Sequence, residues 1–374
     1  MTRLDYRIAS TVLRILGWLF AFLPARRRLV VLASPRKHEL DGNLLAIREE
    51  IQARHPRVRI VELAEMYGYG LRGKLLYALR MARAMYYLRT AGLVVLDNAW
   101  LPAHVAPHPP RTIVVQVWHA VGALKRFGVD TVPPPREPER SFLHRHYDWV
   151  VSSGEASRGP WSRALRTPVD RVIALGAPRT DLLVDPEAVA ASRARVLGRY
   201  PALRGRRVIT YAPTFRGRGR GKEPARGLDA PRLRAALEPT DVLVLKSHPN
   251  LDLALVDTAG FDVVIAPSDD MNEILAATDI LVTDYSSSIF EYALLRRPLV
   301  LLVPDLEAYE REPGMYLDYR TEMIGTQVRS TDEVAAAIAA EAFDLGPYEA
   351  FINRHLGSPD GRSSQRFVDR FLPG

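Results

Sequence analysis

Short apolar runs rich in β-branched residues alternate with helical patterns along most of this 374-residue chain, and this alternation constrains its fold most. The first series of runs lies at Arg28–Ala33, Val58–Leu63, Gly92–Leu96, Thr112–Trp118, Trp149–Ser152 and Val172–Leu175. The second series lies at Val208–Tyr211, Val242–Lys246, Val263–Ile265, Ile280–Thr283 and Leu299–Val303. Continuous apolar runs separated by helices are typical of a parallel sheet covered on both faces. The sequence therefore predicts an α/β fold.

The two series of runs predict two Rossmann-like domains that face a cleft, with ligands bound beyond the carboxyl ends of the strands. We expect a helix within residues 1–27, one domain over residues 28–180 and the other over residues 181–347. A helical segment over residues 348–374 is expected to cross back onto the first domain.

The N-terminal apolar stretch Ile8–Leu23 is interrupted by Arg14 and Gly17. It is shorter than the about 20 residues that a membrane-spanning helix needs. As a helix it has a broad apolar face, and Arg7, Arg14 and Arg26–Arg28 surround that face with positive charge. This pattern predicts an amphipathic helix that lies on an anionic membrane surface. The alternative is a helix that packs within its own domain.

The charge and cysteine content restrict the partners and the chemistry. The chain has 51 Lys and Arg against 43 Asp and Glu, a formal net charge of +8, and no cysteine. The absence of cysteine excludes a disulfide scaffold, Cys-ligated zinc, iron–sulfur clusters and thiol catalysis. The surplus of positive charge favours nucleic acid, a phosphate-rich substrate or an acidic membrane as partner.

In the first domain, His119 directly follows the predicted strand Thr112–Trp118. A histidine at a strand end can remove a proton from an alcohol near neutral pH. Gly122 permits a tight turn, and Lys125 is predicted one to two helical turns further on, where it can meet a phosphate. The alternative interpretation is a histidine that only packs beside the preceding tryptophan.

In the second domain, a strand ends shortly before Thr214 and Arg216. A hydroxyl and a guanidinium after a strand are typical of phosphate binding. The arginine-rich loop that continues through Arg218 and Arg220 is equally consistent with a solvated surface. Thr214 and Arg216 are therefore the phosphate-binding candidates here.

The next strand of this domain ends at Lys246 and is followed by His248. Pro249 prevents the strand from continuing, which fixes His248 at the strand tip. This places a second histidine at a strand end. The alternative is a histidine that merely closes a turn.

A further strand is followed by Asp284, after which Ser286, Ser287 and Ser288 open a helix predicted to continue through Leu295. Serine hydroxyls and free N–H groups at a helix N-terminus favour an anion, although serine is also a common helix cap. Glu291 is placed to accept hydrogen bonds from ribose hydroxyls or simply to suit the first helical turn.

Several motifs are missing from the sequence. It has no Walker lysine and no G-x-G-x-x-G, which disfavours an ordinary ATPase or dehydrogenase. It also has no DxD-type carboxylate pair and no His/Asp cluster at metal spacing. We therefore expect a metal-free mechanism without a cofactor.

Together the motifs resemble the CDP-glycerol glycerophosphotransferase family of teichoic acid and capsule synthesis. The resemblance rests on WHAVGALKRFG at Trp118–Gly128, GAPRTD at Gly176–Asp181, YAPTFR at Tyr211–Arg216, KSHP at Lys246–Pro249, TDYSSSIFEYALLRRP at Thr283–Pro298, PDLEAYEREPGMYLDY at Pro304–Tyr319 and DGRSSQR at Asp360–Arg366. It implies two Rossmann domains of the GT-B type and an N-terminal segment that binds the inner membrane leaflet. The chain is most similar to the shorter, primase-like members that add the first glycerol phosphate.

The reaction expected from this resemblance is transfer of glycerol phosphate from CDP-glycerol to a hydroxyl of a lipid-linked saccharide, with release of CMP. The first domain is expected to bind the acceptor and the second domain the CDP donor. Alternatives are CDP-ribitol as donor, a GT-B glycosyltransferase that uses a nucleotide sugar, and a non-catalytic basic protein that binds membrane or nucleic acid. Nucleic acid is not expected as a partner, and the enzyme is expected at the cytoplasmic face of the plasma membrane.

Each of the site residues has an expected role in this reaction. His119 is the expected base, and His248 with Lys246 is expected to stabilise the pyrophosphate. The other donor-binding residues are expected to be Thr214, Arg216, Asp284, Ser286, Ser287 and Glu291, with Glu291 near the ribose. The residues expected on the phosphate and acceptor side are Gly122, Lys125 and Arg311.

Overall fold

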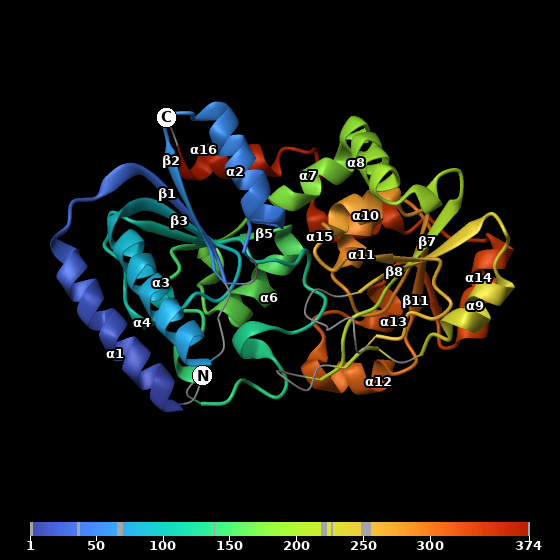
Figure 1. The fold of residues 1–374 in the computed structure, drawn as a ribbon, viewed down its shortest axis with the longest axis horizontal. Coiled ribbons are helices and arrows are strands. Elements are labelled where there is room, and N and C mark those ends of the chain that lie inside the picture. The colour runs from blue at the N-terminus through green and yellow to red at the C-terminus, as the bar shows by residue number, and fades with distance from the viewer. Residues whose placement is uncertain are drawn as a thin grey trace. The chain divides into compact units, whose positions relative to one another are not determined.

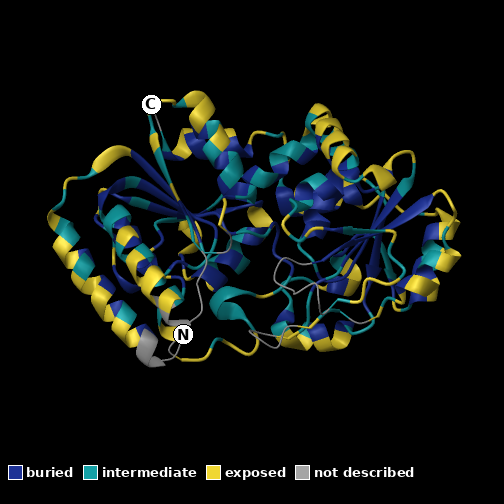
Figure 2. Ribbon diagram, viewed as in Figure 1, coloured by how far each residue is buried: buried dark blue, intermediate teal, exposed yellow. Residues whose placement is uncertain are grey.

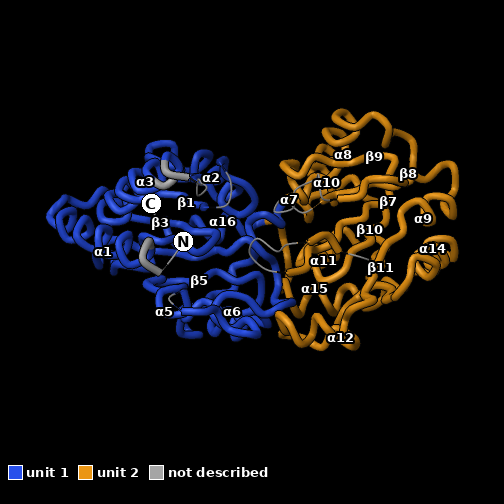
Figure 3. Tube along the Cα trace, turned by 60° about the horizontal axis from the view of Figure 1, so that its bottom comes forward, with its two compact units in different colours: residues 1–181, 362–374 blue, residues 182–361 orange. Residues whose placement is uncertain are grey.

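The protein is described by a computed structural model that covers residues 3–35, 38–65, 70–137, 139–217, 223–225, 227–247 and 256–372. The chain forms two compact units (Figure 3). Unit 1 contains residues 1–181 and 362–374, and unit 2 contains residues 182–361. Figure 1 labels the helices and strands of both units.

Unit 1 is built on a parallel sheet with the strand order β2-β1-β3-β4-β5-β6 among its described residues. β2 lies on one side of β1 and β3 lies on the other. The switch point of the sheet is therefore between β1 and β3. The strands are β1 (Arg26–Ser34), β2 (Arg59–Ala64), β3 (Ala91–Leu96), β4 (Ile113–Gln116), β5 (Trp149–Ser152) and β6 (Val172–Ala174).

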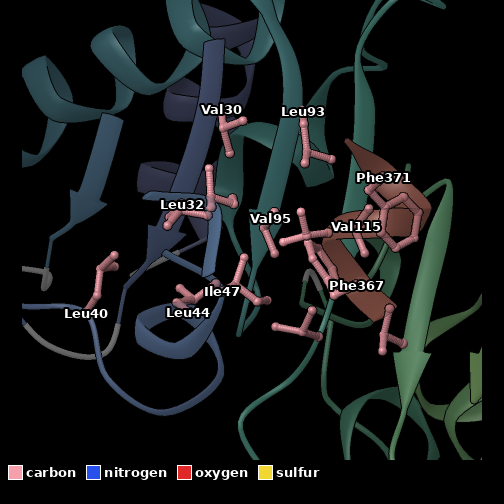
Figure 4. Close-up of a cluster of buried hydrophobic side chains, with 14 residues drawn as sticks. Val30, Leu32, Leu40, Leu44, Ile47, Leu93, Val95, Val115, Phe367 and Phe371 are labelled. Carbon is pink, nitrogen blue, oxygen red and sulfur yellow. The ribbon is translucent and has the colours of Figure 1, made fainter. Parts of the chain in front are cut away.

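Helices cover both faces of this sheet (Figure 1). Those of unit 1 are α1 (Arg3–Leu19), α2 (Gly42–Arg54), α3 (Gly70–Thr90), α4 (Leu101–Val105), α5 (Glu139–Phe142), α6 (Glu155–Leu165) and α16 (Ser363–Phe371). α2 and α16 pack on one face, where Leu44 and Ile47 from α2 and Phe367 and Phe371 from α16 join the strand residues in one apolar core (Figure 4). The last helix of the chain therefore completes the core of the first unit.

The N-terminal helix α1 lies against α3. Its buried residues Tyr6, Ser10 and Leu13 recur at helical spacing, and a Cβ on Gly17 would come within 3.3 Å of the Met85 sulfur on α3. The opposite face of α1 remains exposed (Figure 2), and it carries Ile8, Val12, Ile15, Trp18 and Leu19, while Phe22 is exposed in the turn after the helix. The helix thus packs within its own unit and also presents apolar side chains to solvent.

Unit 2 is built on a second parallel sheet, with the order β12-β11-β10-β7-β8-β9 among its described residues. Read from the other edge, this is the Rossmann order, and the switch point lies between β7 and β10. The strands are β7 (Arg207–Ala212), β8 (Asp241–Lys246), β9 (Val263–Ile265), β10 (Ile280–Thr283), β11 (Leu299–Leu302) and β12 (Thr326–Val328).

Two apolar cores, one on each face, hold the helices of unit 2 to its sheet. One core includes α9 and α14, and the other includes α8 and α10. The helices are α7 (Asp181–Val184, across the boundary between the units), α8 (Pro186–Arg199), α9 (Ala230–Ala236), α10 (Met271–Ala277), α11 (Ser288–Ala293), α12 (Leu306–Tyr309), α13 (Tyr319–Glu322), α14 (Thr331–Ala340) and α15 (Tyr348–Leu356), with a short π-helical segment η7 (Glu310–Gly314) after α12.

The α/β fold with two parallel, Rossmann-like sheets confirms the sequence-based prediction. Three details differ from it. β4 ends at Gln116 instead of Trp118, because Trp118 adopts a left-handed φ of 51° that no strand can continue through. The short polar strand β12 was not predicted. The C-terminal segment is two helices, of which only α16 belongs to unit 1.

Candidate active site

In unit 1, His119 lies in a loop at the carboxyl end of β4. The described stretch from Val117 to Phe127 contains no helix, so the prediction of a helix leading to Lys125 was wrong. Gly122 turns the loop with a φ of 67°, and its N–H donates to Ser153 Oγ over 3.0 Å. The turn expected at Gly122 is therefore present.

The imidazole of His119 is half-buried and contacts the end of the neighbouring strand. Its Nδ1 lies 3.1 Å from the backbone carbonyl oxygen of Asp97, which follows β3. A carbonyl oxygen only accepts hydrogen bonds, so in the neutral ring this contact requires the proton to be on Nδ1. The lone pair is then on Nε2, which is the atom that a general base uses.

A buried polar cluster lies behind this loop. Tyr147 Oη is 2.9 Å from His104 Nε2 and 3.1 Å from His144 Nδ1, and the His144 ring packs edge-on against Trp118. Burial, followed by the charge of Arg166, lowers the pKa of His144 to about 3. Burial also lowers the pKa of His104 well below its usual value, so both histidines are neutral near pH 7.

In unit 2, Thr214 and Asp284 meet at the switch point between β7 and β10. Thr214 donates its backbone N–H to Asp284 Oδ1 over 2.9 Å and its hydroxyl to Asp284 Oδ2 over 3.0 Å. Both side chains are almost fully buried, at 5 % and 3 % exposure. The two residues therefore form one rigid pair where a Rossmann-like sheet binds its ligand.

Arg216 is held by two carboxylates and two aromatic rings. It donates from Nε and Nη2 to Asp305, over 2.7 and 3.2 Å, and its Nη1 lies 2.9 Å from Asp284 Oδ2. Its guanidinium carbon lies 5.1 Å from the ring centre of Tyr285 and 5.2 Å from that of Tyr309. The positive charge of Arg216 is thus already compensated before any phosphate binds.

The charges in this cluster support one another. Burial raises the pKa of Asp305, but the hydrogen bonds and the charge of Arg216 outweigh burial, and the net pKa is lowered. Burial likewise lowers the pKa of Arg216, yet the hydrogen bonds and charges of Asp305 and Asp284 raise it overall. Tyr285 completes the cluster by donating to Asp305 Oδ1 over 2.9 Å.

A pocket of about 400 Å³ opens beside this cluster, at the carboxyl ends of β7 and β11. It is lined by Arg216, Glu223, Pro224, Gly227, Pro304 and Asp305. Its volume falls in the range of small-molecule sites.

Lys246 is buried at 4 % exposure and donates from Nζ to the carbonyl oxygens of Ala266 and Pro267, over 2.9 and 3.0 Å. These two bonds fix the ammonium group of Lys246 at the end of β8. His248 lies outside the described residues, and its role stays a prediction.

The serine-rich segment forms a shorter helix than predicted, because α11 runs only from Ser288 to Ala293. Ser286 Oγ accepts hydrogen bonds from the N–H and the hydroxyl of Ser288, over 3.2 and 2.8 Å. Glu291 is only 3 % exposed, and Arg311 is exposed on η7. The donor and acceptor roles of Ser286, Ser287, Glu291 and Arg311 stay predictions.

Sequence reasoning gave no role to Asp97, Tyr285 or Asp305, although the last two lie within motifs that it singled out. Their roles depend on contacts across the fold, such as the 89 residues that separate Arg216 from Asp305. Within the described residues, no group of three or more His, Cys, Asp or Glu side chains is arranged to hold a metal ion.

The fold and the strand-end residues define a two-unit, Rossmann-like α/β protein. This fold is shared with the solved structure of the wall teichoic acid polymerase TagF, with a TM-score of 0.75 and 21% identity over 99% of this chain and 98% of that one. The sequence profile of the family described as CDP-Glycerol:Poly(glycerophosphate) glycerophosphotransferase matches residues 17–372. The chain belongs to this family, as its motifs predicted, and is an enzyme of the teichoic acid phosphotransferase class.

Two curated relatives differ in the polyol that their names specify. The chain is 32% identical to the teichoic acid ribitol-phosphate primase of Bacillus spizizenii, over 99% of this chain and 96% of the relative. It is 24% identical to the teichoic acid glycerol-phosphate primase of Bacillus subtilis, over 78% of this chain and 76% of the relative. Family membership therefore leaves both polyols in consideration.

Proposed function

We propose that this enzyme transfers a polyol phosphate from a CDP-polyol to a hydroxyl of a lipid-linked saccharide and releases CMP. The observation that carries the proposal is the contact between His119 Nδ1 and the Asp97 carbonyl oxygen, because it leaves Nε2 free of its proton. A neutral imidazole held in one tautomer suits the removal of a proton from an alcohol.

In the proposed reaction, His119 Nε2 takes the proton of the acceptor hydroxyl as that oxygen attacks the β-phosphorus of the donor. The new bond joins the acceptor oxygen to the β-phosphorus, and the bond from the β-phosphorus to the bridging oxygen breaks. The bond electrons leave with CMP. Positive charge near the bridging oxygen stabilises this departure, and His248 and Lys246 are proposed to supply it.

Unit 2 is proposed to bind the CDP part of the donor. Thr214, Ser286 and Ser287 offer hydroxyl groups to the phosphates, and the pocket beside Arg216 is proposed to receive part of the nucleotide. Because Arg216 is already paired with Asp284 and Asp305, we propose that it orders the phosphate-binding loop and contributes less as a bare cation. Asp284 is likewise proposed to orient Thr214. Glu291 is proposed to contact the ribose.

On the acceptor side, we propose that half-buried Lys125 and exposed Arg311 bind phosphate groups of the lipid-linked substrate. Gly122 shapes the loop that carries His119.

Of the two polyols we propose ribitol first, a change from the glycerol that the sequence motifs suggested. The proposal is supported by the 32% identity with a ribitol-phosphate primase across nearly the full length of both chains. Because that relative is named a primase and is matched over 96% of its length, we also propose that a single unit is added. The test is to incubate the protein with CDP-ribitol and CDP-glycerol separately and to weigh the lipid-linked products by mass spectrometry. Products from CDP-glycerol alone would overturn the choice of ribitol, and no product from either donor would overturn the function.

We also propose that unit 1 binds the surface of an anionic membrane at the cytoplasmic face. Within the described residues, no helix is long and apolar enough to cross a membrane. The exposed face of α1 is instead joined by a second exposed apolar group on α3, made of Leu75, Leu76 and Leu79. Arg7, Arg14 and Arg72 are exposed on the same two helices and supply the positive charge that anionic lipid attracts.

A further inference from the structure

Three consecutive backbone carbonyl groups in the loop that carries His119 accept hydrogen bonds from two side chains far away in sequence. Asn43 Nδ2 donates to the carbonyl oxygens of Val117 and Trp118, over 3.2 and 2.9 Å. Arg179 Nη1 donates to the carbonyl oxygen of His119 itself, over 3.0 Å. The two side chains therefore fix the backbone on which the imidazole is mounted.

Asn43 and Arg179 are also tied to each other, because the Arg179 backbone N–H donates to Asn43 Oδ1 over 3.0 Å. Asn43 is 3 % exposed and stands in the first turn of α2, where a buried amide is costly unless it is hydrogen-bonded. Gly42 beside it leaves room for the guanidinium, since a Cβ there would come within 3.2 Å of Arg179 Nη1.

The loop needs such support because Trp118 adopts a left-handed φ of 51°, which is strained for a bulky side chain. The Trp118 N–H is also held, by Gln116 Oε1 over 2.9 Å. The bonds to its carbonyl groups and to its N–H therefore hold this backbone conformation directly beside His119, whose Nδ1 contacts Asp97.

We infer that Asn43 and Arg179 are positioning residues for His119, and that they maintain the tautomer with the Nε2 lone pair. The inference rests on the proposed function, in which His119 is the base. It assigns a role to the arginine of the GAPRTD motif, which the proposed reaction otherwise leaves without one. The pair acts through the loop and does not contact the reacting atoms.

Two substitutions test this role. Asn43→Asp keeps the shape and the acceptor for Arg179 but places a carboxylate against two carbonyl oxygens, and Arg179→Gln removes the bond to His119. Each is expected to lower kcat by about 10- to 100-fold, with the donor KM changed by less than about twofold. Arg158→Gln is the matched control, because Arg158 also donates to backbone carbonyl groups in unit 1, those of Val169 and Val172. It is expected to retain full activity.

A double variant that combines Arg179→Gln with His119→Ala tests whether Arg179 acts through His119 or has a role of its own. Arg179→Gln is expected to cause no further loss of activity in that background, whereas a multiplied loss would overturn the inference. Thermal unfolding of every variant checks that it folds, and the milder Asn43→Ser serves if Asn43→Asp does not. A positioning role would also be contradicted if either substitution raised the donor KM by as large a factor as it lowered kcat.

A spectroscopic measurement makes the inference independent of the assay. Imidazole 15N chemical shifts, assigned to His119 by comparison with His119→Ala, are expected to report the Nδ1–H tautomer in the unsubstituted enzyme and a mixture in Arg179→Gln. Unchanged tautomer populations would overturn the positioning role even if the enzyme transfers polyol phosphate. Conversely, an altered tautomer in a protein without transferase activity would support the positioning and overturn the proposed function.

Discussion

Asp284 binds Thr214 through both of its carboxylate oxygens, one to the backbone N–H at 2.9 Å and one to the hydroxyl at 3.0 Å. This pair joins the ends of β7 and β10 across the switch point of unit 2. It also receives Arg216 Nη1 at Asp284 Oδ2, over 2.9 Å. Asp284 is therefore a buried carboxylate that connects both Thr214 and Arg216 to the end of β10.

Asp284→Asn is expected to raise the donor KM and to lower the free energy of unfolding of unit 2 by about 1–3 kcal/mol. If the asparagine oxygen accepts the hydrogen bond from the Thr214 N–H, its amino group must face the Arg216 guanidinium. Two hydrogen-bond donors would then face each other. Calorimetry and initial rates at varied CDP-polyol measure the two effects. An unchanged KM would contradict the role given to this pair in donor binding.

Arg216→Lys is expected to raise the donor KM by about tenfold. Lysine cannot reproduce the two-pronged bond to Asp305 or the stacking against Tyr285 and Tyr309. The matched control is Arg207→Lys at the opposite end of β7, where Arg207 makes a similar two-pronged pair with Asp241, over 2.7 and 2.9 Å. The control is expected to leave the donor KM unchanged, and an equal rise in both variants would indicate a general loss of stability.

His119→Ala is expected to lower kcat by about 10²- to 10⁴-fold, the usual contribution of a general base. The rate is measured as CMP released per enzyme in the presence of the lipid-linked acceptor. A released nucleoside diphosphate would instead indicate a nucleotide-sugar donor. Full activity of the variant would remove His119 from the mechanism.

Membrane binding is expected to depend on α1 and α3 together. Trp18→Glu combined with Leu79→Glu should reduce sedimentation with vesicles that contain anionic lipid, because both side chains are more than 60% exposed, at 65% and 61%. Val169→Glu changes another exposed apolar residue of unit 1, at 52%, and is expected to leave binding intact. An equal loss of vesicle binding in the double variant and in Val169→Glu would contradict a membrane-binding surface specific to α1 and α3.

Stability is expected to fall as the pH drops from about 6.5 toward 5. In the unfolded chain His104 and His144 bind protons near their ordinary pKa of about 6.5. In the folded chain burial lowers the pKa of His144 to about 3, and that of His104 is also far below normal. The unfolded state then binds more protons, so each buried histidine destabilises the fold by up to about 1.4 kcal/mol per pH unit. Denaturant unfolding at several pH values measures the slope, and His144→Gln should reduce it.

Much of the fold was predictable because it depends on local patterns. The apolar runs of the central strands, such as Val242–Lys246 and Ile280–Thr283, are long enough to identify from sequence, and parallel pairing follows from the helices between them. β12 was missed because its three residues include two polar ones and carry little pattern. The helix expected after His119 was wrong because Gly122 adopts a left-handed φ of 67°, which no right-handed helix can continue through.

The candidate site was predictable in its residue types but not in its pairings. A strand-end arginine such as Arg216 looks the same in sequence whether it is free for a phosphate or paired with Asp305. The same holds for Lys246, whose ammonium donates to two carbonyl groups of a distant loop. These partners lie between 20 and 89 residues away in sequence and are set by tertiary packing, so only the structure identifies them.

The closing of unit 1 by α16 bears on how the chain folds during synthesis. Phe367 and Phe371 belong to the same core as β1 and α2, and the α16 N-terminus is held by Asp181, which accepts from the N–H groups of Ser363 and Ser364. Unit 2 is in effect an insertion within unit 1, and all of its residues leave the ribosome before α16 does. Unit 1 therefore begins first and is completed last, and until α16 emerges the apolar face that it covers stays open to aggregation.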